Sequence, residues 1–296
     1  MTAWASWHVY QHQGQDRLLV ESVSPLVRDV RAEGLADRGF VLRYWDGGPH
    51  VRLRLRATSD AALAELESRV PGELRRWCRD HPSERAMGAE EYALLRARIG
   101  DPASAAEVVP DGSVVRAAYE PEHERYGRGA ALAACEEHFD DSTRIALDVL
   151  AAQPAPASRN SLAVLILAGF LAARGSRAGV GWARRVQAAG VPPAARLDLR
   201  RVSSLLERPP AALVRFTRSL DRLEAALLAA SGDDYRPPAV GFGGVPFETI
   251  GARDPIATLD ICIHLFANRI GVTMPTELTL RASLAQGLLA RTEADV

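Results

Sequence analysis

The 296-residue chain contains no lysine, so all 36 of its basic residues are arginine. This absence excludes mechanisms that need a lysine amine, such as Schiff-base and pyridoxal-phosphate catalysis and phosphate loops ending in Gly-Lys-Ser/Thr. Any anion that the protein binds must therefore be held by guanidinium groups, backbone N–H groups or histidine.

Net charge, cysteine and long apolar runs are also scarce. The 36 basic and 37 acidic residues leave a formal charge of −1, so broad nucleic-acid binding has no electrostatic support. Cys78, Cys135 and Cys262 lie far apart, which argues against a disulfide framework or a structural zinc site and favours the cytoplasm. The N-terminus has no signal-peptide pattern. The longest apolar run, residues 162–173, is shorter than the ~20 residues of a membrane span and predicts a buried helix.

Strand patterns are concentrated in the first 120 residues or so. We expect strands over residues 4–11, 40–45 and 50–56, a tight turn at residues 46–49, and two short strands around Asp111-Gly112. We expect helices over residues 18–31, with a start at Ser24-Pro25, and over residues 58–70, with a break at Pro71-Gly72 before a continuation to residue 79.

The remainder of the chain has helical spacing. Pro154 and Pro156 mark a linker, and residues 231–251 form a Gly- and Pro-rich loop. Helices are expected over residues 128–151, 162–173, 197–206, 211–228, 255–270 (with Asp254 as N-cap) and 277–290. We predict an α+β fold in one domain over residues 1–296, with a strand-rich part at 1–152 and a helix-rich part at 157–296.

Residues 50–56 (HVRLRLR) carry the most informative pattern. Strand alternation places Val51, Leu53 and Leu55 on one face and His50, Arg52, Arg54 and Arg56 on the other. A half-solvated basic strand would show the same alternation. Guanidinium groups at this spacing nevertheless suit a ligand with two carboxylates, so the strand suggests an anion-binding surface.

Two other segments combine titratable groups. Residues 119–127 (YEPEHERYG) precede a helix and are compatible either with a site or with a charged loop whose acids cap that helix. In the helix near the C-terminus, Asp260, His264 and Asn268 are spaced four apart and share one face. A carboxylate beside an imidazole suits a general base, although a histidine satisfied within the core would fit the same spacing.

These segments together resemble a known family. Residues 40–54 (FVLRYWDGGPHVRLR) are similar to a signature of the C-terminal elimination domain of class I lanthipeptide dehydratases (LanB), called the thiopeptide-type bacteriocin biosynthesis domain when it stands alone. Residues 119–127 with Asp141-Ser142, and residues 264–271 (HLFANRIG), resemble its second and third signatures in the correct order. The resemblance extends from about residue 4 to residue 290. It departs at Arg128, where the family usually has a glycine.

The resemblance implies an enzyme, a lyase, that eliminates glutamate from glutamylated Ser or Thr of a precursor peptide and leaves dehydroalanine or dehydrobutyrine. It implies that Arg52, Arg54 and Arg125 hold carboxylates and that His264 transfers the proton. No metal or organic cofactor is expected. The residues expected to contact the substrate are His50, Arg56, Tyr119, Glu122, Tyr126 and Asn268.

The family also contains thiopeptide pyridine synthases, which join two dehydroalanines by a formal aza-[4+2] cycloaddition and release the leader peptide. The four matched residues favour elimination. A non-enzymatic subunit that binds the leader is a third alternative. The expected partners are a leader-bearing precursor peptide and a separate glutamyl-tRNA-dependent glutamylation protein. We expect no direct nucleic-acid or membrane contact, and a homodimer is compatible with the sequence.

Overall fold

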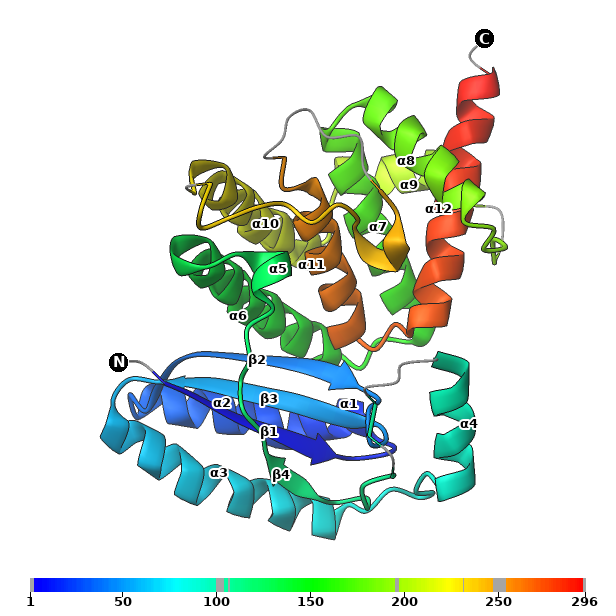
Figure 1. The fold of residues 1–296 in the computed structure, drawn as a ribbon. Coiled ribbons are helices and arrows are strands. Elements are labelled where there is room, and N and C mark those ends of the chain that lie inside the picture. The colour runs from blue at the N-terminus through cyan, green and yellow to red at the C-terminus, as the bar shows by residue number, and fades with distance from the viewer. Residues whose placement is uncertain are drawn as a thin grey trace. The chain divides into compact units, whose positions relative to one another are not determined.

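A computed structural model describes residues 3–99, 104–105, 107–194, 197–230, 232–246 and 254–294. The chain divides into two compact units, Met1–Glu120 and Pro121–Val296. The first contains the sheet and the second is helical (Figure 1). The α+β fold predicted from the sequence is confirmed, and the change from strands to helices lies near residue 120.

The first unit is built on an antiparallel sheet with strand order β2-β3-β1-β4 (Figure 1). The strands are β1 (Trp4–Tyr10), β2 (Ala36–Tyr44), β3 (His50–Ala57) and β4 (Val114–Arg116). The β2–β3 turn has Gly47 and Gly48 at positive φ, as the Asp-Gly pattern predicted. Of the strands expected around Asp111-Gly112, only β4 is present among the described residues, so the expected strand before the turn was wrong.

Of the helices of the first unit, α2 (Ser24–Ala32) and α3 (Asp60–Asp80) pack on one face of this sheet, where the alternate residues Val51, Leu53 and Leu55 are fully buried. The other helices are α1 (Gln15–Leu18), the π-helical turn η1 (Leu19–Val23) and α4 (Ala89–Ile99). The sequence did not predict α4. Its first turn is exposed and acidic, which is typical of a solvated surface. The helix is held by the buried Tyr92, whose hydroxyl accepts a hydrogen bond from the Gly47 amide at 2.9 Å.

One expectation about proline is confirmed and one was wrong. Helix α2 begins at Ser24 with Pro25 in its first turn, as expected, and it follows α1 and the π-helical turn η1, which ends at Val23. A π turn widens the backbone where proline has no N–H and would collide with the preceding turn. Pro71 lies inside the continuous helix α3, because the buried positions Leu66, Val70 and Leu74 continue through it. Core packing here outweighs the hydrogen bond lost at Pro71.

The second unit consists of helices around an apolar core. They are α5 (His123–Tyr126), α6 (Gly129–Ala151), α7 (Pro156–Ala173), α8 (Ser176–Ala188), α9 (Leu199–Glu207), α10 (Ala211–Ala229), α11 (Ile256–Arg269) and α12 (Met274–Ala294), with a short 3₁₀ turn η2 (Phe242–Gly244). Helix α11 begins one residue later than expected. The Asp254 carboxylate still accepts a hydrogen bond from the Ile256 amide at 3.0 Å. Part of the loop expected at residues 231–251 lies outside the described residues.

Helix α7 is long and apolar enough to span a membrane, and it is the one such helix among the described residues. Half of its apolar window is buried within the protein. Leu165, Ile166 and Leu167 are each 5% exposed or less, so the buried helix expected at residues 162–173 is confirmed.

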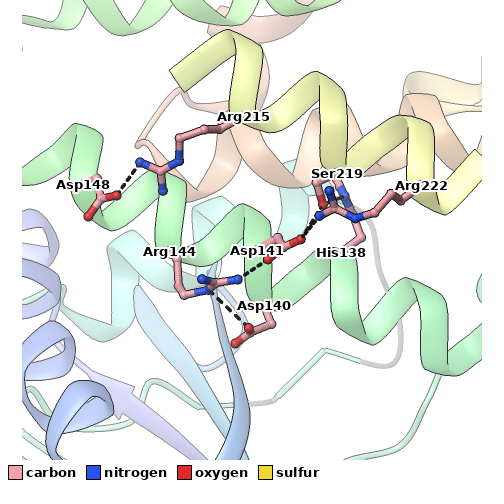
Figure 2. Close-up of polar contacts among 8 residues, drawn as sticks. All are labelled: His138, Asp140, Asp141, Arg144, Asp148, Arg215, Ser219 and Arg222. Atoms are coloured by element: carbon pink, nitrogen blue, oxygen red, sulfur yellow. Dashed lines mark hydrogen bonds and ion pairs between the residues drawn. The ribbon is translucent and has the colours of Figure 1, made fainter. Parts of the chain in front are cut away.

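A polar network joins α6 to α10 within this core (Figure 2). The Nδ1 atom of His138 lies 2.9 Å from the Ser219 hydroxyl, which donates to Asp141 at 3.0 Å, and Asp141 in turn pairs with Arg222 at 2.6 Å. His138 is 1% exposed, and burial lowers its pKa to about 3. The histidine is therefore neutral in the folded protein and serves packing between the two helices.

Candidate functional site

The first unit carries an arginine–aromatic face, which we define as Arg52 and Arg54 of β3 with Phe40, Tyr44 and Tyr119. Strand register brings these groups together, because Arg52 and Arg54 lie opposite Leu42 and Phe40 on β2. The guanidinium carbon of Arg52 lies 3.5 Å from the centroid of the Tyr44 ring, and that of Arg54 lies 4.8 Å from Tyr119 and 5.3 Å from Phe40. Cation–π contacts thus help to orient both guanidinium groups.

Arg52 pairs with no carboxylate among the residues that the structure describes. Its Nε atom lies 3.4 Å from Nε2 of His50, whose Nδ1 atom bonds to the Gly48 carbonyl oxygen at 2.9 Å. The ring of His50 also stacks on His8, with centroids 4.7 Å apart. His50 is fully buried, so its contact with Arg52 suits a positioning role better than direct contact with a substrate.

The two histidines beside the arginines are held neutral. Burial, and next the positive charges of Arg52 and Arg54, lower the pKa of His8 to about 4. Burial also lowers the pKa of His50 to about 3; the hydrogen bond to Gly48 opposes this effect, and the charge of Arg52 adds to it. The face therefore carries the charge of its arginines alone at neutral pH, which is the condition for attracting an anion.

Arg56, two residues farther along the same strand, is different. It forms a fork with Asp37, with Nε and one terminal nitrogen 2.8 and 2.5 Å from the carboxylate oxygens. This bidentate pair lowers the pKa of Asp37 through the hydrogen bond from Arg56. Arg56 thus already has an internal carboxylate, unlike Arg52.

In the second unit, α11 and α12 hold a chain of four ionisable side chains. The Nδ1 atom of His264 lies 2.7 Å from Glu277, Glu277 accepts from Arg281 at 2.9 Å, and Arg281 donates to Asp260 at 2.7 Å. The carboxylate that orients His264 is therefore Glu277, and the expectation that Asp260 does so was wrong. Asp260 instead forms an ion pair with Arg281, because a second carboxylate stabilises this buried guanidinium group.

The contact with Glu277 distinguishes the two ring nitrogens of His264. When Nδ1–H donates to Glu277, the lone pair of the ring lies on Nε2, the nitrogen that can remove a proton. The side chain of His264 is 20% exposed and that of Glu277 only 5%, so the imidazole is the member of the chain that solvent reaches. The ring of Phe242 stacks on the imidazole with centroids 3.7 Å apart and 9° between the planes.

Charge pairing outweighs burial at Glu277 and Arg281, whereas burial raises the pKa of Asp260 in spite of its pairing with Arg281. Burial alone would raise the pKa of Glu277, but the hydrogen bond to His264 and the charge of Arg281 lower it instead. Burial likewise opposes the charge of Arg281, and its two carboxylate partners raise the pKa of the guanidinium overall. Glu277 is consequently an anion, as an orienting partner for the imidazole must be.

Residues 119–127 are divided between different roles. Arg125 is exposed on α5 and forms a 2.7 Å ion pair with Glu122, which is also exposed. Tyr126 is buried against Phe139, with ring centroids 5.0 Å apart, and burial raises the pKa of its hydroxyl. Tyr126 therefore acts as a core residue, whereas Arg125 is accessible. Asn268, one turn beyond His264 on α11, is partly exposed.

Arg128, where the sequence departs from the family signature, forms part of the turn that begins α6. The residue adopts an extended conformation that starts α6, and its amide donates to the Asp234 carbonyl oxygen at 2.6 Å. Gly127 before it has φ of 77°, and a Cβ there would collide with the same carbonyl. The turn is thus preserved by Gly127, and a side chain at residue 128 is accommodated.

No group of three or more His, Cys, Asp or Glu residues suitable for a metal ion occurs in the described part of the chain. What the molecule does contain is a cationic aromatic face and an oriented histidine. The chemistry that such groups support is carboxylate binding and proton transfer.

Comparison with protein families agrees with this chemistry. Residues 4–288 match the model described as lantibiotic biosynthesis dehydratase, C-terminal domain. The chain belongs to this family. Membership assigns it to the maturation of ribosomally made peptides, as the sequence signatures implied, and leaves the particular reaction open. No curated protein sequence matches the chain.

Three solved structures share the fold. The pyridine synthase TbtD from thiomuracin biosynthesis has a TM-score of 0.68 at 17% identity, covering 99% of this chain and 100% of its own. The tRNA-dependent lantibiotic dehydratase MibB from Microbispora sp. 107891 has a TM-score of 0.61 at 20% identity, and the match covers 98% of this chain but 28% of MibB. TsrL has a TM-score of 0.57 at 17% identity, covering 100% of this chain and 96% of its own.

Proposed function

We propose that the protein eliminates glutamate from glutamylated Ser or Thr residues of a ribosomally made precursor peptide. The observation that carries the proposal is the state of Arg52, whose guanidinium is oriented by Tyr44 and His50 and has no carboxylate partner within the described residues. A glutamyl ester supplies one carboxylate in the substrate and a second as the leaving group forms, and each is suited to a guanidinium fork.

In this reaction a base removes the Cα proton, the Cβ–O bond breaks, a C=C bond forms and glutamate leaves as a carboxylate. His264 is the proposed base, acting through Nε2 while Glu277 holds the other ring nitrogen. Arg52, Arg54 and Arg125 are proposed to bind the glutamyl carboxylates and to stabilise the charge that develops on the leaving oxygen. Tyr119 contacts Arg54, and Arg125 would exchange its exposed ion-pair partner Glu122 for the carboxylate of the substrate.

The proposal makes the protein a lyase of the cytoplasm that depends on another protein for glutamylation. Its chain corresponds in fold to 28% of MibB. Incubation with a chemically glutamylated precursor peptide, followed by mass spectrometry, tests the activity directly. The expected product is the dehydrated peptide plus free glutamate, with no added cofactor. Glutamyl groups that persist after long incubation would refute the elimination.

A second candidate is pyridine synthesis by cycloaddition of two dehydroalanines. It is favoured by the likeness to TbtD over the full length of both chains. Shared fold alone does not carry an activity, so the arginine–aromatic face keeps elimination first. A multiply dehydrated precursor distinguishes the two reactions: conversion to a macrocycle with loss of the leader would replace elimination by the synthase reaction.

A further inference from the structure

A groove of about 790 Å³ crosses the second unit, and none of its lining residues belongs to the His264 chain. Helices α7 and α9 provide most of the lining, and the ends of α6 and α10 and Leu280 of α12 complete it. Helix α7 contributes Ser158, Ser161, Leu162 and Leu165, and the N-cap and body of α9 contribute Asp198, Arg201, Val202 and Leu205. Both sets follow the i, i+3, i+4, i+7 spacing of one helical face. Helices α7 and α9 thus each present one helical face to the groove.

The space exists because α9 does not pack fully on its neighbours. No residue of α9 is buried, although the helix contains Leu199, Val202, Leu205 and Leu206. Leu199 lies against Gly287 of α12, and Leu206 lies 3.4 Å from the position of a Cβ on Gly169 of α7. Two glycines therefore anchor one side of α9, while Val202 and Leu205 face the groove. Leu205 is 39% exposed.

The segment that contains α7 and α9 is rich in arginine. Residues 151–220 contain eleven arginines and two acidic residues, and two of these arginines, Arg174 and Arg215, pair with acids outside the segment. Arg200, Arg201 and Arg208 are exposed and form no ion pair within the described residues. An apolar floor with a cationic rim is complementary to an apolar stripe flanked by acids.

The shape of the groove selects among anionic partners. No strand edge lies along it in the described part of the second unit, so an extended peptide would find no backbone ladder to join. Nucleic acid would satisfy the arginines and leave the floor of Leu162, Val164 and Leu165 unfilled. A helix with apolar residues on one face and acidic residues beside them matches both features.

We propose that the groove between α7 and α9 is a docking site for an acidic amphipathic helix of a partner protein. The site is independent of the proposed elimination, because none of its residues belongs to the arginine–aromatic face or to the His264 chain. Docking would bury Val202 and Leu205 and place acidic side chains beside Arg201 and Arg208.

A binding assay with synthetic peptides tests the proposal. The probe is a fluorescein-labelled helical peptide of about 18 residues, with Leu at i, i+3, i+4 and i+7 spacing and Glu elsewhere. Two matched peptides serve as controls: one has the same composition with the Leu residues scattered, and one has Lys in place of Glu. Fluorescence anisotropy should show binding on the order of 10 µM for the first peptide alone, weakening with salt.

Protein variants then locate the binding. Leu205→Asp should weaken binding by about tenfold or more, whereas Leu228→Asp, at an exposed apolar residue of α10 outside the groove, should leave it within about twofold. Arg201→Glu should weaken binding more than Arg218→Glu does. Circular dichroism checks that each variant is folded, and all four substitutions lie at exposed positions.

Three results would overturn the proposal. Equal binding of the scattered peptide, or no binding at about 200 µM, would show that no helix-specific site exists. Displacement of the peptide by single-stranded RNA, with equal effects of Arg201→Glu and Arg218→Glu, would make the region a nucleic-acid surface. A dimer in sedimentation that Leu205→Asp dissociates would assign the groove to a second copy of this chain.

Discussion

Arg52 in the first unit and Arg281 in the second hold their guanidinium groups in opposite ways. Arg281 is 2% exposed and lies between two carboxylates, Glu277 and Asp260. Arg52 lies over the ring of Tyr44 and beside neutral His50, with no carboxylate partner among the described residues. The charge of Arg281 is compensated inside the fold, so it can position other groups. The charge of Arg52 is oriented but uncompensated, so it can meet an anion from outside.

This contrast depends on the residues that surround each arginine. Aromatic rings and neutral histidines fix the orientation of a guanidinium while leaving its charge in place. Carboxylates fix it and cancel the charge. The two regions should therefore respond differently to substitution: changes around Arg281 should affect stability and the orientation of His264, and changes around Arg52 and Arg54 should affect anion binding.

The largest effect is expected for His264→Ala. Removal of the proposed base should slow elimination by about 10²–10⁴-fold, with peptide affinity little changed. The measurement is the rate of dehydrated product formation from glutamylated peptide at saturation, with binding followed separately. Glu277→Gln, which keeps an acceptor for Nδ1–H and removes the charge, should give an intermediate rate. A folded His264→Ala protein with an undiminished rate would leave His264 as a core histidine.

The next effect is on stability. Asp260→Ala leaves buried Arg281 with one carboxylate, and loss of one partner of a buried pair costs about 3–5 kcal/mol. Asp37→Ala is the matched control, because its partner Arg56 lies at the surface, where ion pairs contribute about 0–1 kcal/mol. Urea denaturation of both variants measures the difference in unfolding free energy. Equal losses would mean that the buried chain gives no more stability than a surface pair.

The arginine–aromatic face is tested by Arg54→Lys. An ammonium group cannot reproduce a bidentate fork, so we expect elimination to slow by about 100-fold. Arg56→Lys is the control on the same strand: Arg56 is paired with Asp37, and its replacement should change the rate by about twofold at most. Full activity of Arg54→Lys would remove Arg54 from carboxylate binding.

Periodicity predicted the strands and most helices because it records burial. It located β3 and its two faces within one residue, since Val51, Leu53 and Leu55 alternate strictly with the arginines. It failed where tertiary packing outweighed a local signal, as at Pro71 inside α3. Helix α4 was missed because a single buried tyrosine, rather than an apolar stripe, anchors it.

The sequence predicted only part of the candidate site, because periodicity reports burial along one element and not contacts between elements. His264 was found through its position on a helix, but its partner was assigned to Asp260, four residues away on that helix. Glu277 comes from a different helix, and Phe242 comes from the Gly-rich loop. Spacing along one element carries no information about either contact. The i, i+4 spacing of Glu277 and Arg281 predicts an ion pair within α12, but it does not predict the contact of Glu277 with His264.

The smallest effect concerns acid. Each unit buries one neutral histidine whose pKa is lowered to about 3, His50 in the first and His138 in the second. An unfolded histidine titrates near 6.5, so the unfolded chain takes up protons first as the pH falls. The contribution of each neutral histidine to the free energy of unfolding should be fully present above about pH 6.5. It should decline at lower pH, by about 2 kcal/mol per histidine at pH 5. Urea midpoints between pH 5 and 8 measure this slope.

His138→Gln should reduce the slope of the unfolding free energy against pH by the equivalent of about one bound proton. The control His81→Gln, at a partly exposed histidine, should leave the slope unchanged. An unchanged slope in His138→Gln would mean that the histidine is protonated, or absent from the core, in the folded protein. A change confined to that variant would show that burial between α6 and α10 keeps His138 neutral.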